Sequence, residues 1–111
     1  MTEFATTKVK LVTVIVPFEL GDSVANDLRT LGVSGFTTSS AHGWERHSRQ
    51  AGLTSGASVR LETLATAEMA HAIFSYVVAR SSDEDLVAFA QDVEAVPESH
   101  FSEQSPERTT P

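Results

Sequence analysis

Cysteine is absent from all 111 residues of the chain, which excludes a disulfide framework, a thiolate metal site and a cysteine nucleophile. Long apolar runs are also missing, since the one around Val14–Val16 is far shorter than the roughly 20 residues of a membrane-spanning helix. Basic residues are few: 8 Lys and Arg stand against 15 Asp and Glu, and the net charge of −7 argues against general nucleic-acid binding. Met1–Thr7 lacks the basic and apolar regions of a signal peptide, so we expect a cytoplasmic protein.

The length and composition fit one small globular domain. A chain of 111 residues is an ordinary size for one domain. Its content of 41% hydrophobic and 21% charged residues is near the globular average, which excludes wholesale disorder. Ser102–Pro111 contains two prolines and no large apolar residue, so it cannot bury surface to offset the entropy of ordering. We therefore expect a domain over residues 1–101 and a flexible polar tail over 102–111.

The first strong structural signal is Lys8–Val16, a run rich in β-branched residues that is followed by Pro17 and predicts a strand. Alternate residues point to opposite faces, and both sets are mainly apolar: Val9, Leu11, Thr13 and Ile15 on one side, Lys10, Val12, Val14 and Val16 on the other. A strand with one face in water would carry polar residues at every second position. We therefore expect this strand to be covered on both faces.

The rest of the chain alternates between helix and strand signals. Asp22 and Ser23 are typical helix starts, and Gly32 is typical just past a helix end. Thr66 suits the N-cap of a second helix. The predicted elements are a helix over Phe18–Leu31, a strand over Gly35–His42, a loop over Gly43–Ala57, a strand over Ser58–Leu64, a helix over Thr66–Arg80, a polar break over Ser81–Asp85 and a strand over Leu86–Val96.

This order, β-α-β-β-α-β, predicts the α+β class and the ferredoxin-like arrangement, with a long loop between strands 2 and 3. Two helices cover one face of a four-stranded sheet and leave the other face open. Because the first strand is apolar on both faces, we expect copies of the chain to associate through the open face.

The fold alone does not decide the function, and three hypotheses remain open at this point. A small enzyme has little support, because there is no G-x-S-x-G motif and no acid pair with helical or strand support. A metal-binding module could use His42, Glu45 and His47. An anion-sensing oligomer could use Arg46 and Arg49, because one guanidinium group can donate two parallel hydrogen bonds to a phosphate or carboxylate. The neighbouring Gly43 lets backbone N–H groups approach the anion closely.

Three motifs, in this order and spacing, are similar to the PII signalling family. They are Val14–Leu20 (VIVPFEL), Leu31–Thr37 (LGVSGFT) and His42–Arg46 (HGWER), and Val59–Glu62 resembles the strand that follows in that family. The resemblance spans about residues 8–96. It implies a non-enzymatic homotrimer that binds adenine nucleotides between subunits and docks onto a target protein through the long loop, called the T-loop, at about residues 43–57.

The resemblance also implies a set of ligand-binding residues. Those expected to bind the nucleotide are Val14, Gly35, Phe36, Thr37, Leu64, Phe89 and His100, with Gly43 and Arg46 near its phosphates. The ligands are expected to include no catalytic cofactor and no metal. Two departures from the family affect the choice of nucleotide: the turn after the second helix is the acidic Ser81–Asp85, and Glu98 and His100 stand where two arginines are expected. We therefore expect ADP, AMP or cyclic AMP rather than ATP–magnesium.

The shortened turn makes the chain most similar to the PII-like proteins of inorganic-carbon metabolism, the SbtB-like and carboxysome-associated group. That subgroup implies control of a bicarbonate transporter or another carbon-metabolism protein, with bicarbonate as a further ligand. Arg46, His47, Arg49 and Arg60 are the groups expected to hold it. The alternatives are a nitrogen-regulatory PII-type sensor of another transporter, or a metal-binding ferredoxin-like module using His42 and His47.

Overall fold

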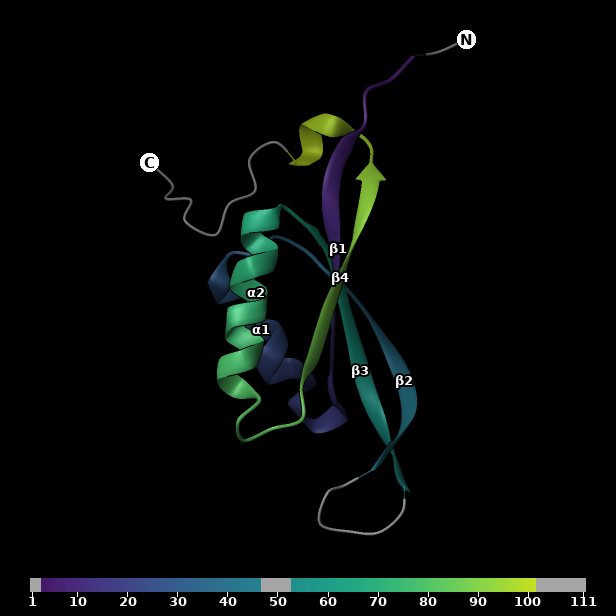
Figure 1. The fold of residues 1–111 in the computed structure, drawn as a ribbon, viewed down its shortest axis with the longest axis vertical. Coiled ribbons are helices and arrows are strands. Elements are labelled where there is room, and N and C mark those ends of the chain that lie inside the picture. The colour runs from purple at the N-terminus through teal and green to yellow at the C-terminus, as the bar shows by residue number, and fades with distance from the viewer. Residues whose placement is uncertain (1–2, 47–52, 102–111) are drawn as a thin grey trace.

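The computed structural model describes residues 3–46 and 53–101 of the chain (Figure 1). Its elements are β1 (Thr7–Pro17), the 3-10 helix η1 (Phe18–Leu20), α1 (Gly21–Leu31), β2 (Thr37–Arg46), β3 (Leu53–Ala65), α2 (Ala67–Arg80), β4 (Val87–Ala95) and the 3-10 helix η2 (Glu98–Phe101). The predicted tail over 102–111, and His47 and Arg49 of the predicted loop, lie outside the described residues. No helix in the described part is long and apolar enough to cross a membrane.

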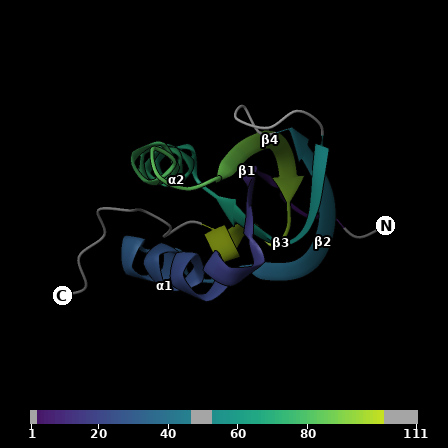
Figure 2. The ribbon, with the colours of Figure 1, turned by 90° about the horizontal axis from the view of Figure 1, so that it is seen from below.

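The four strands form one antiparallel sheet in the order β2-β3-β1-β4. Both helices lie on the same side of this sheet, as the end-on view in Figure 2 shows. The predicted ferredoxin-like βαββαβ arrangement is therefore confirmed. The two outermost strands are β2 and β4, so each presents one unpaired backbone edge within a single chain.

The hydrophobic core lies between the helices and the sheet. From β1 it receives Val12, Val14 and Val16, which are at most 2% exposed, as their alternation predicts. The helices contribute Leu28 from α1 and Ile73 from α2, each at most 1% exposed. Burying large aliphatic side chains in this way contributes about 1.5–3 kcal/mol for each side chain.

The two helices begin for different local reasons. At α2, the Thr66 side chain accepts a hydrogen bond of 3.0 Å from the backbone N–H of Met69, which confirms the predicted N-cap. At α1, the chain first makes the turn η1, and the helix starts at Gly21, just ahead of Asp22. A Cβ on Gly21 would lie 3.1 Å from Cγ2 of Val59, so glycine allows α1 to start close against β3.

The segment between β2 and β3 differs from the sequence prediction. We expected a loop over Gly43–Ala57, whereas β2 continues to Arg46 and β3 begins at Leu53. The register pairs Gly43 with Gly56 and Arg46 with Leu53, so the two strands satisfy each other's backbone groups. Poor strand propensity in this Gly- and Ser-rich stretch is outweighed by pairing with a partner strand. The predicted loop is thus a long hairpin whose described arms extend past the helices (Figure 1).

The face of the sheet opposite the helices is called the open face here. It carries the second set of β1 residues, Val9, Leu11, Thr13 and Ile15, and the residues that pair directly with them on β3 and β4. On β4 these include Val87, which is 57% exposed, and Phe89, which is 43% exposed. An apolar strip of this kind on a single chain is typical of an interaction surface.

Candidate functional site

The turn that joins α1 to β2 is held on both sides by hydrogen bonds. Gly32 adopts φ of 122°, and its N–H contacts the carbonyls of Leu28 and Arg29 at 3.2 and 3.1 Å, which ends the helix. From β3, the Thr63 hydroxyl donates to the Gly35 carbonyl at 2.6 Å. The predicted nucleotide residues Gly35, Phe36 and Thr37 therefore stand on a fixed turn at the start of β2.

A row of three polar residues and one aromatic residue crosses the open face next to this turn. The strand registers place Thr37, Glu62, Thr13 and Phe89 side by side on β2, β3, β1 and β4. Within the row the Thr13 hydroxyl donates to Oε2 of Glu62 at 3.2 Å, and Thr13 is 1% exposed. The half-buried Glu62 carboxylate is thereby fixed beside Thr37.

Two residues near the turn were missed by the sequence analysis. Glu62 was treated only as part of the predicted strand over Ser58–Leu64, although the register places it opposite Thr37. Arg29 was not singled out within the predicted helix over Phe18–Leu31, yet its guanidinium carbon lies 5.4 Å from the centre of the Phe36 ring. The spacing of residues along the helix gave no signal for the contact between Arg29 and Phe36, because this contact depends on how the chain turns back after Gly32.

The remaining predicted residues are distributed over the sheet. Leu64 and Phe89 lie on the open face, so both share a surface with Thr37. Val14 faces the helices, and with 2% exposure its side chain belongs to the core. Arg60 is exposed on the open face of β3, between Ser39 and Ile15.

The other predicted residues lie at the two ends of the molecule. Gly43 and Arg46 belong to the hairpin arm of β2, whereas the exposed His100 belongs to η2 at the opposite end (Figure 1). The His100 ring contacts Phe101 edge to face, with ring centres 5.0 Å apart. A single chain therefore does not bring the full predicted set together.

The acidic turn after α2 is tied to both helices through Arg80. Its guanidinium donates to Glu84 of the turn, to Asp27 of α1 at 2.8 Å and to the Tyr76 hydroxyl at 2.8 Å. It also donates to Ser23 at 3.1 Å. The pKa of Arg80 is raised, mainly by its hydrogen bond to Glu84, so the guanidinium stays charged. These contacts make up the Arg80 cluster, which consists of Ser23, Asp27, Tyr76, Arg80 and Glu84.

Tyr76 completes this cluster by donating to Oδ2 of Asp27 at 2.6 Å. Burial is the main reason that the pKa of Tyr76 is raised, and the hydrogen bond to Asp27 acts in the same direction. The phenol therefore keeps its proton at neutral pH. Since Asp27 lies on α1 and Arg80 on α2, the cluster fixes the two helices and the acidic turn relative to one another.

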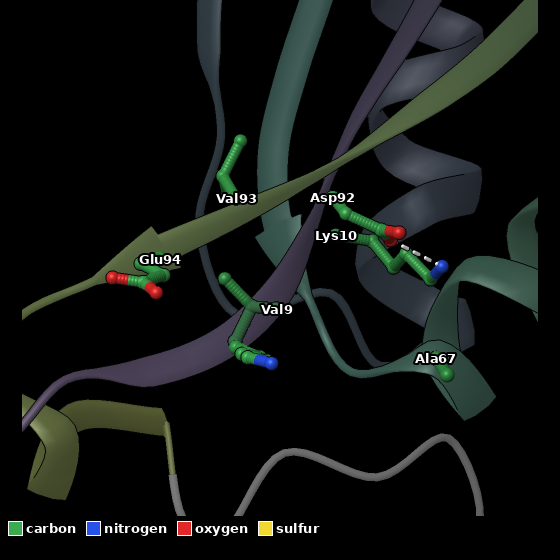
Figure 3. A pocket seen from close by; sticks show the side chains of 7 residues that line it. Val9, Lys10, Ala67, Asp92, Val93 and Glu94 are labelled. Carbon is green, nitrogen blue, oxygen red and sulfur yellow. Dashed lines mark hydrogen bonds and ion pairs between the residues drawn. The ribbon is translucent and has the colours of Figure 1, made fainter.

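A hollow of about 460 Å³ lies where β1 and β4 meet the start of α2 (Figure 3). Its lining consists of Lys8, Val9, Lys10, Ala67, Asp92, Val93 and Glu94. Lys10 donates to Oδ1 of Asp92 at 2.5 Å, and this hydrogen bond lowers the pKa of the Asp92 carboxyl. Two lysines face two carboxylates, so the hollow has no excess of positive charge for a phosphate. None of the predicted nucleotide residues lines it.

The metal alternative depends on a residue outside the described part of the chain. His42 pairs with Ala57 in the β2–β3 register and Glu45 pairs with Thr54, while His47 lies outside the described residues. Among the described residues, no group of three or more His, Cys, Asp or Glu is placed to hold a metal ion. A site that uses His47 stays a prediction.

Comparison with known proteins gives a consistent result. Residues 9–100 match the family model described as nitrogen regulatory protein P-II. No curated protein matches the chain at a significant level. Among solved structures, a PII-like signaling protein from Thermus thermophilus is 24% identical with a TM-score of 0.69, and the match covers 84% of this chain and 94% of that one.

Two further structures show the same fold with ligands bound. CPII, a nitrogen regulatory PII-like protein from Thiomonas intermedia bound to ADP, AMP and bicarbonate, is 15% identical with a TM-score of 0.73, covering 84% of this chain and 98% of that one. GlnK of B. subtilis in complex with ATP is 15% identical with a TM-score of 0.57, covering 78% and 82% of the two chains. Because the sequence identities are below 25%, the similarity to these structures establishes the fold alone.

Proposed function

Because this chain belongs to the nitrogen regulatory protein P-II family, whose model matches residues 9–100, we propose that it is a non-enzymatic signalling protein that senses an adenine nucleotide. Proteins of this family are typically trimers. The proposed assembly is a homotrimer with one nucleotide in each cleft between subunits. The proposal is supported chiefly by the position of the Gly35–Thr37 turn at the rim of the apolar open face.

The incomplete site of a single chain supports the placement between subunits. Thr37, Glu62 and Phe89 share the open face, whereas His100 and the Arg46 backbone lie at opposite ends of the molecule. When a second copy covers the open face, it can add its own residues to the ligand site next to the turn. Association would also bury Val87 and Phe89, which are 57% and 43% exposed in one chain.

The acidic turn favours nucleotides with fewer phosphates. Arg80 neutralises Glu84, but Asp83 and Asp85 are exposed and have no such partner in the described part of the chain. A carboxylate close to a phosphate at a protein surface is repelled by about 1 kcal/mol or more. ADP and AMP are the nucleotides bound in CPII, which has the same fold. We place ADP, AMP or cyclic AMP ahead of ATP–magnesium.

The hairpin of β2 and β3 is the proposed partner-binding element. Its arms extend beyond the helices, so its backbone is accessible to another protein (Figure 1). In the finer proposal the chain is a cytoplasmic protein of the SbtB-like, carboxysome-associated group, and its partner is a membrane transporter of bicarbonate or another carbon-metabolism protein. CPII binds bicarbonate, and here Arg46, His47, Arg49 and Arg60 are the proposed bicarbonate groups.

Titration calorimetry with four nucleotides tests the main proposal. We expect AMP, ADP or cyclic AMP to bind, and ATP with magnesium to bind more weakly. Changing Asp83 and Asp85 to asparagine should narrow the difference between ADP and ATP, because it removes two negative charges from the turn. Failure of all four nucleotides to bind the wild-type protein would contradict the proposed function.

Replacing Gly35 by alanine is expected to weaken nucleotide binding without destabilising the fold. A Cβ at Gly35 would meet no atom within 4 Å, so the methyl group would stand in the space that a ligand needs. We expect the free energy of unfolding to change by less than about 0.5 kcal/mol. Calorimetry and denaturant unfolding measure the two effects.

The matched control is Gly32→Ala in the same turn. Gly32 has φ of 122°, which alanine adopts with strain, so this variant should lose about 1 kcal/mol of stability. Unchanged nucleotide affinity in Gly35→Ala would mean that no ligand approaches this turn.

A further inference from the structure

The open face carries one cation and one anion where it crosses β1, although the whole chain has 8 Lys and Arg against 15 Asp and Glu. They are Arg60 and Glu62, which are two residues apart on β3 and therefore lie on the same face of the sheet. The described residues around them on β1 and β4 are uncharged: Val9, Leu11, Thr13, Ile15, Val87, Phe89, Gln91 and Val93. The centre of this face is therefore neutral in a chain with a net charge of −7.

Neither of these charges is compensated by an opposite charge within one chain. Glu62 is half-buried and accepts a hydrogen bond of 3.2 Å from the neutral Thr13 hydroxyl. Arg60 is exposed and forms no ion pair in the described part of the chain, whereas Lys10 and Arg80 each bind a carboxylate. In a single subunit both groups therefore depend on water for their solvation.

Association of subunits through the open face would remove this water. The strand registers place Arg60 in one row with Val87, and Glu62 in the next row with Phe89. Val87 and Phe89 are exposed apolar residues that a neighbouring subunit would cover, so it would also enclose the charges in the same rows. A charge buried without a partner strongly destabilises an interface, whereas an opposite charge within reach offsets the loss of hydration.

We propose that Arg60 of each subunit binds the Glu62 carboxylate of a neighbouring subunit across the open face. This assignment rests on the proposed function and names the polar contact that holds its assembly together. In a rotational assembly each subunit presents Arg60 to one neighbour and Glu62 to the other, so a trimer closes with every one of these charges paired.

The ion pairs would also fix how the subunits are placed relative to one another. Apolar contacts alone are non-directional, whereas a mismatched arrangement would bring like charges together or leave a buried charge unpaired. A guanidinium has five N–H donors, so Arg60 can bind a carboxylate through two of them and keep donors for the bicarbonate proposed above.

Reversing one charge tests this pairing. In Arg60→Glu each contact would bring two carboxylates together, so we expect the concentration at which trimers dissociate to rise by about a hundredfold or more. Sedimentation over a range of protein concentrations measures this shift. Lys10→Glu is the matched control, because Lys10 lies on the helix side of β1 and pairs with Asp92. Its trimer should dissociate at the same concentration as that of the wild type.

A double exchange separates pairing from damage to the fold. Arg60→Glu combined with Glu62→Arg has the composition of the wild type and restores opposite charges at every contact. We expect this double variant to recover most of the stability that Arg60→Glu loses as a trimer. Circular dichroism of the single variant should show the wild-type content of helix and strand, because Arg60 is exposed in one chain.

Cross-linking shows whether the pair joins two chains. The chain has no cysteine, so Arg60→Cys and Glu62→Cys each carry a single thiol. When these two variants are refolded together, the contact between residue 60 of one and residue 62 of the other contains neither charge and is favoured. A short bismaleimide should therefore link two chains more often in the mixture than in either variant alone.

Three results would overturn the pairing while leaving the proposed function in place. They are an Arg60→Glu protein that dissociates at the wild-type concentration, a double exchange that recovers no stability, and a mixture with no more cross-linked chains than the single variants. Wild-type protein that sediments as one chain and binds no nucleotide would overturn the proposed function itself, and the pairing with it.

Discussion

Replacing Phe89 by glutamate is expected to convert the proposed trimer into single subunits. Phe89 is 43% exposed in one chain and lies on the open face beside Thr13, so association would bury its ring. The variant would place a carboxylate in each of three equivalent contacts, and a buried, unpaired carboxylate is destabilising by several kcal/mol. Sedimentation or light scattering should show the mass of one 11.9 kDa chain in place of three.

The matched control is Val78→Glu on the outer side of α2. Val78 is 72% exposed and lies on the helical layer, away from the open face, so the same kind of charge should leave the assembly intact. Nucleotide binding should be lost in Phe89→Glu and kept in Val78→Glu, because the proposed cleft lies between subunits. A Phe89→Glu protein that remains trimeric would show that another surface holds the subunits together.

The parts of the fold that depend on short-range patterns could be predicted from the sequence. The β-branched run that forms β1, the Thr66 cap of α2 and the glycine after α1 each depend on a few neighbouring residues. These signals gave the correct element order and placed Val12, Val14 and Val16 on one face of β1, but they did not indicate which face packs in the core. What covers the other side of β1 stays a prediction, because it depends on a second copy of the chain.

The long hairpin could not be predicted in this way. Gly43, Gly56 and the serines near them have little strand propensity of their own. They form strands because each arm of the hairpin supplies hydrogen-bond partners for the other, and the propensity of either arm alone does not show this pairing. The propensity of the single residues therefore indicated a loop where cross-strand pairing produces strands.

The same limit explains the residues of the candidate site that were missed. Glu62 becomes a site residue only when the register places it opposite Thr37 and within hydrogen-bond distance of Thr13. A signal was available, since a hairpin centred near residue 50 pairs Thr37 with a residue close to Glu62. Arg29 offered no comparable signal, because its contact with Phe36 depends on the three-dimensional path of the turn.

Replacing Arg80 by methionine is expected to lower the free energy of unfolding by about 2 kcal/mol. Methionine keeps much of the aliphatic volume but removes the donors to Asp27, Tyr76 and Glu84. The Asp27 and Glu84 side chains are 47% and 31% exposed, so water partly replaces the lost contacts and keeps the effect moderate. Denaturant unfolding measures the change, and amide exchange should speed up over Ser81–Asp85 as the turn loses its anchor.

Arg29→Met separates this cluster from a general effect of removing an arginine. Arg29 bonds only neutral groups in the described part of the chain, so its loss should change the unfolding free energy by less than about 0.5 kcal/mol. The difference in unfolding free energy between Arg80→Met and Arg29→Met should be the same at pH 6 and pH 8. In the wild-type protein the raised pKa values of Arg80 and Tyr76 keep both groups protonated over this range, so the contacts that Arg80→Met removes do not change with pH. Equal losses in the two variants would mean that the Arg80 cluster does not hold α1, α2 and the acidic turn together.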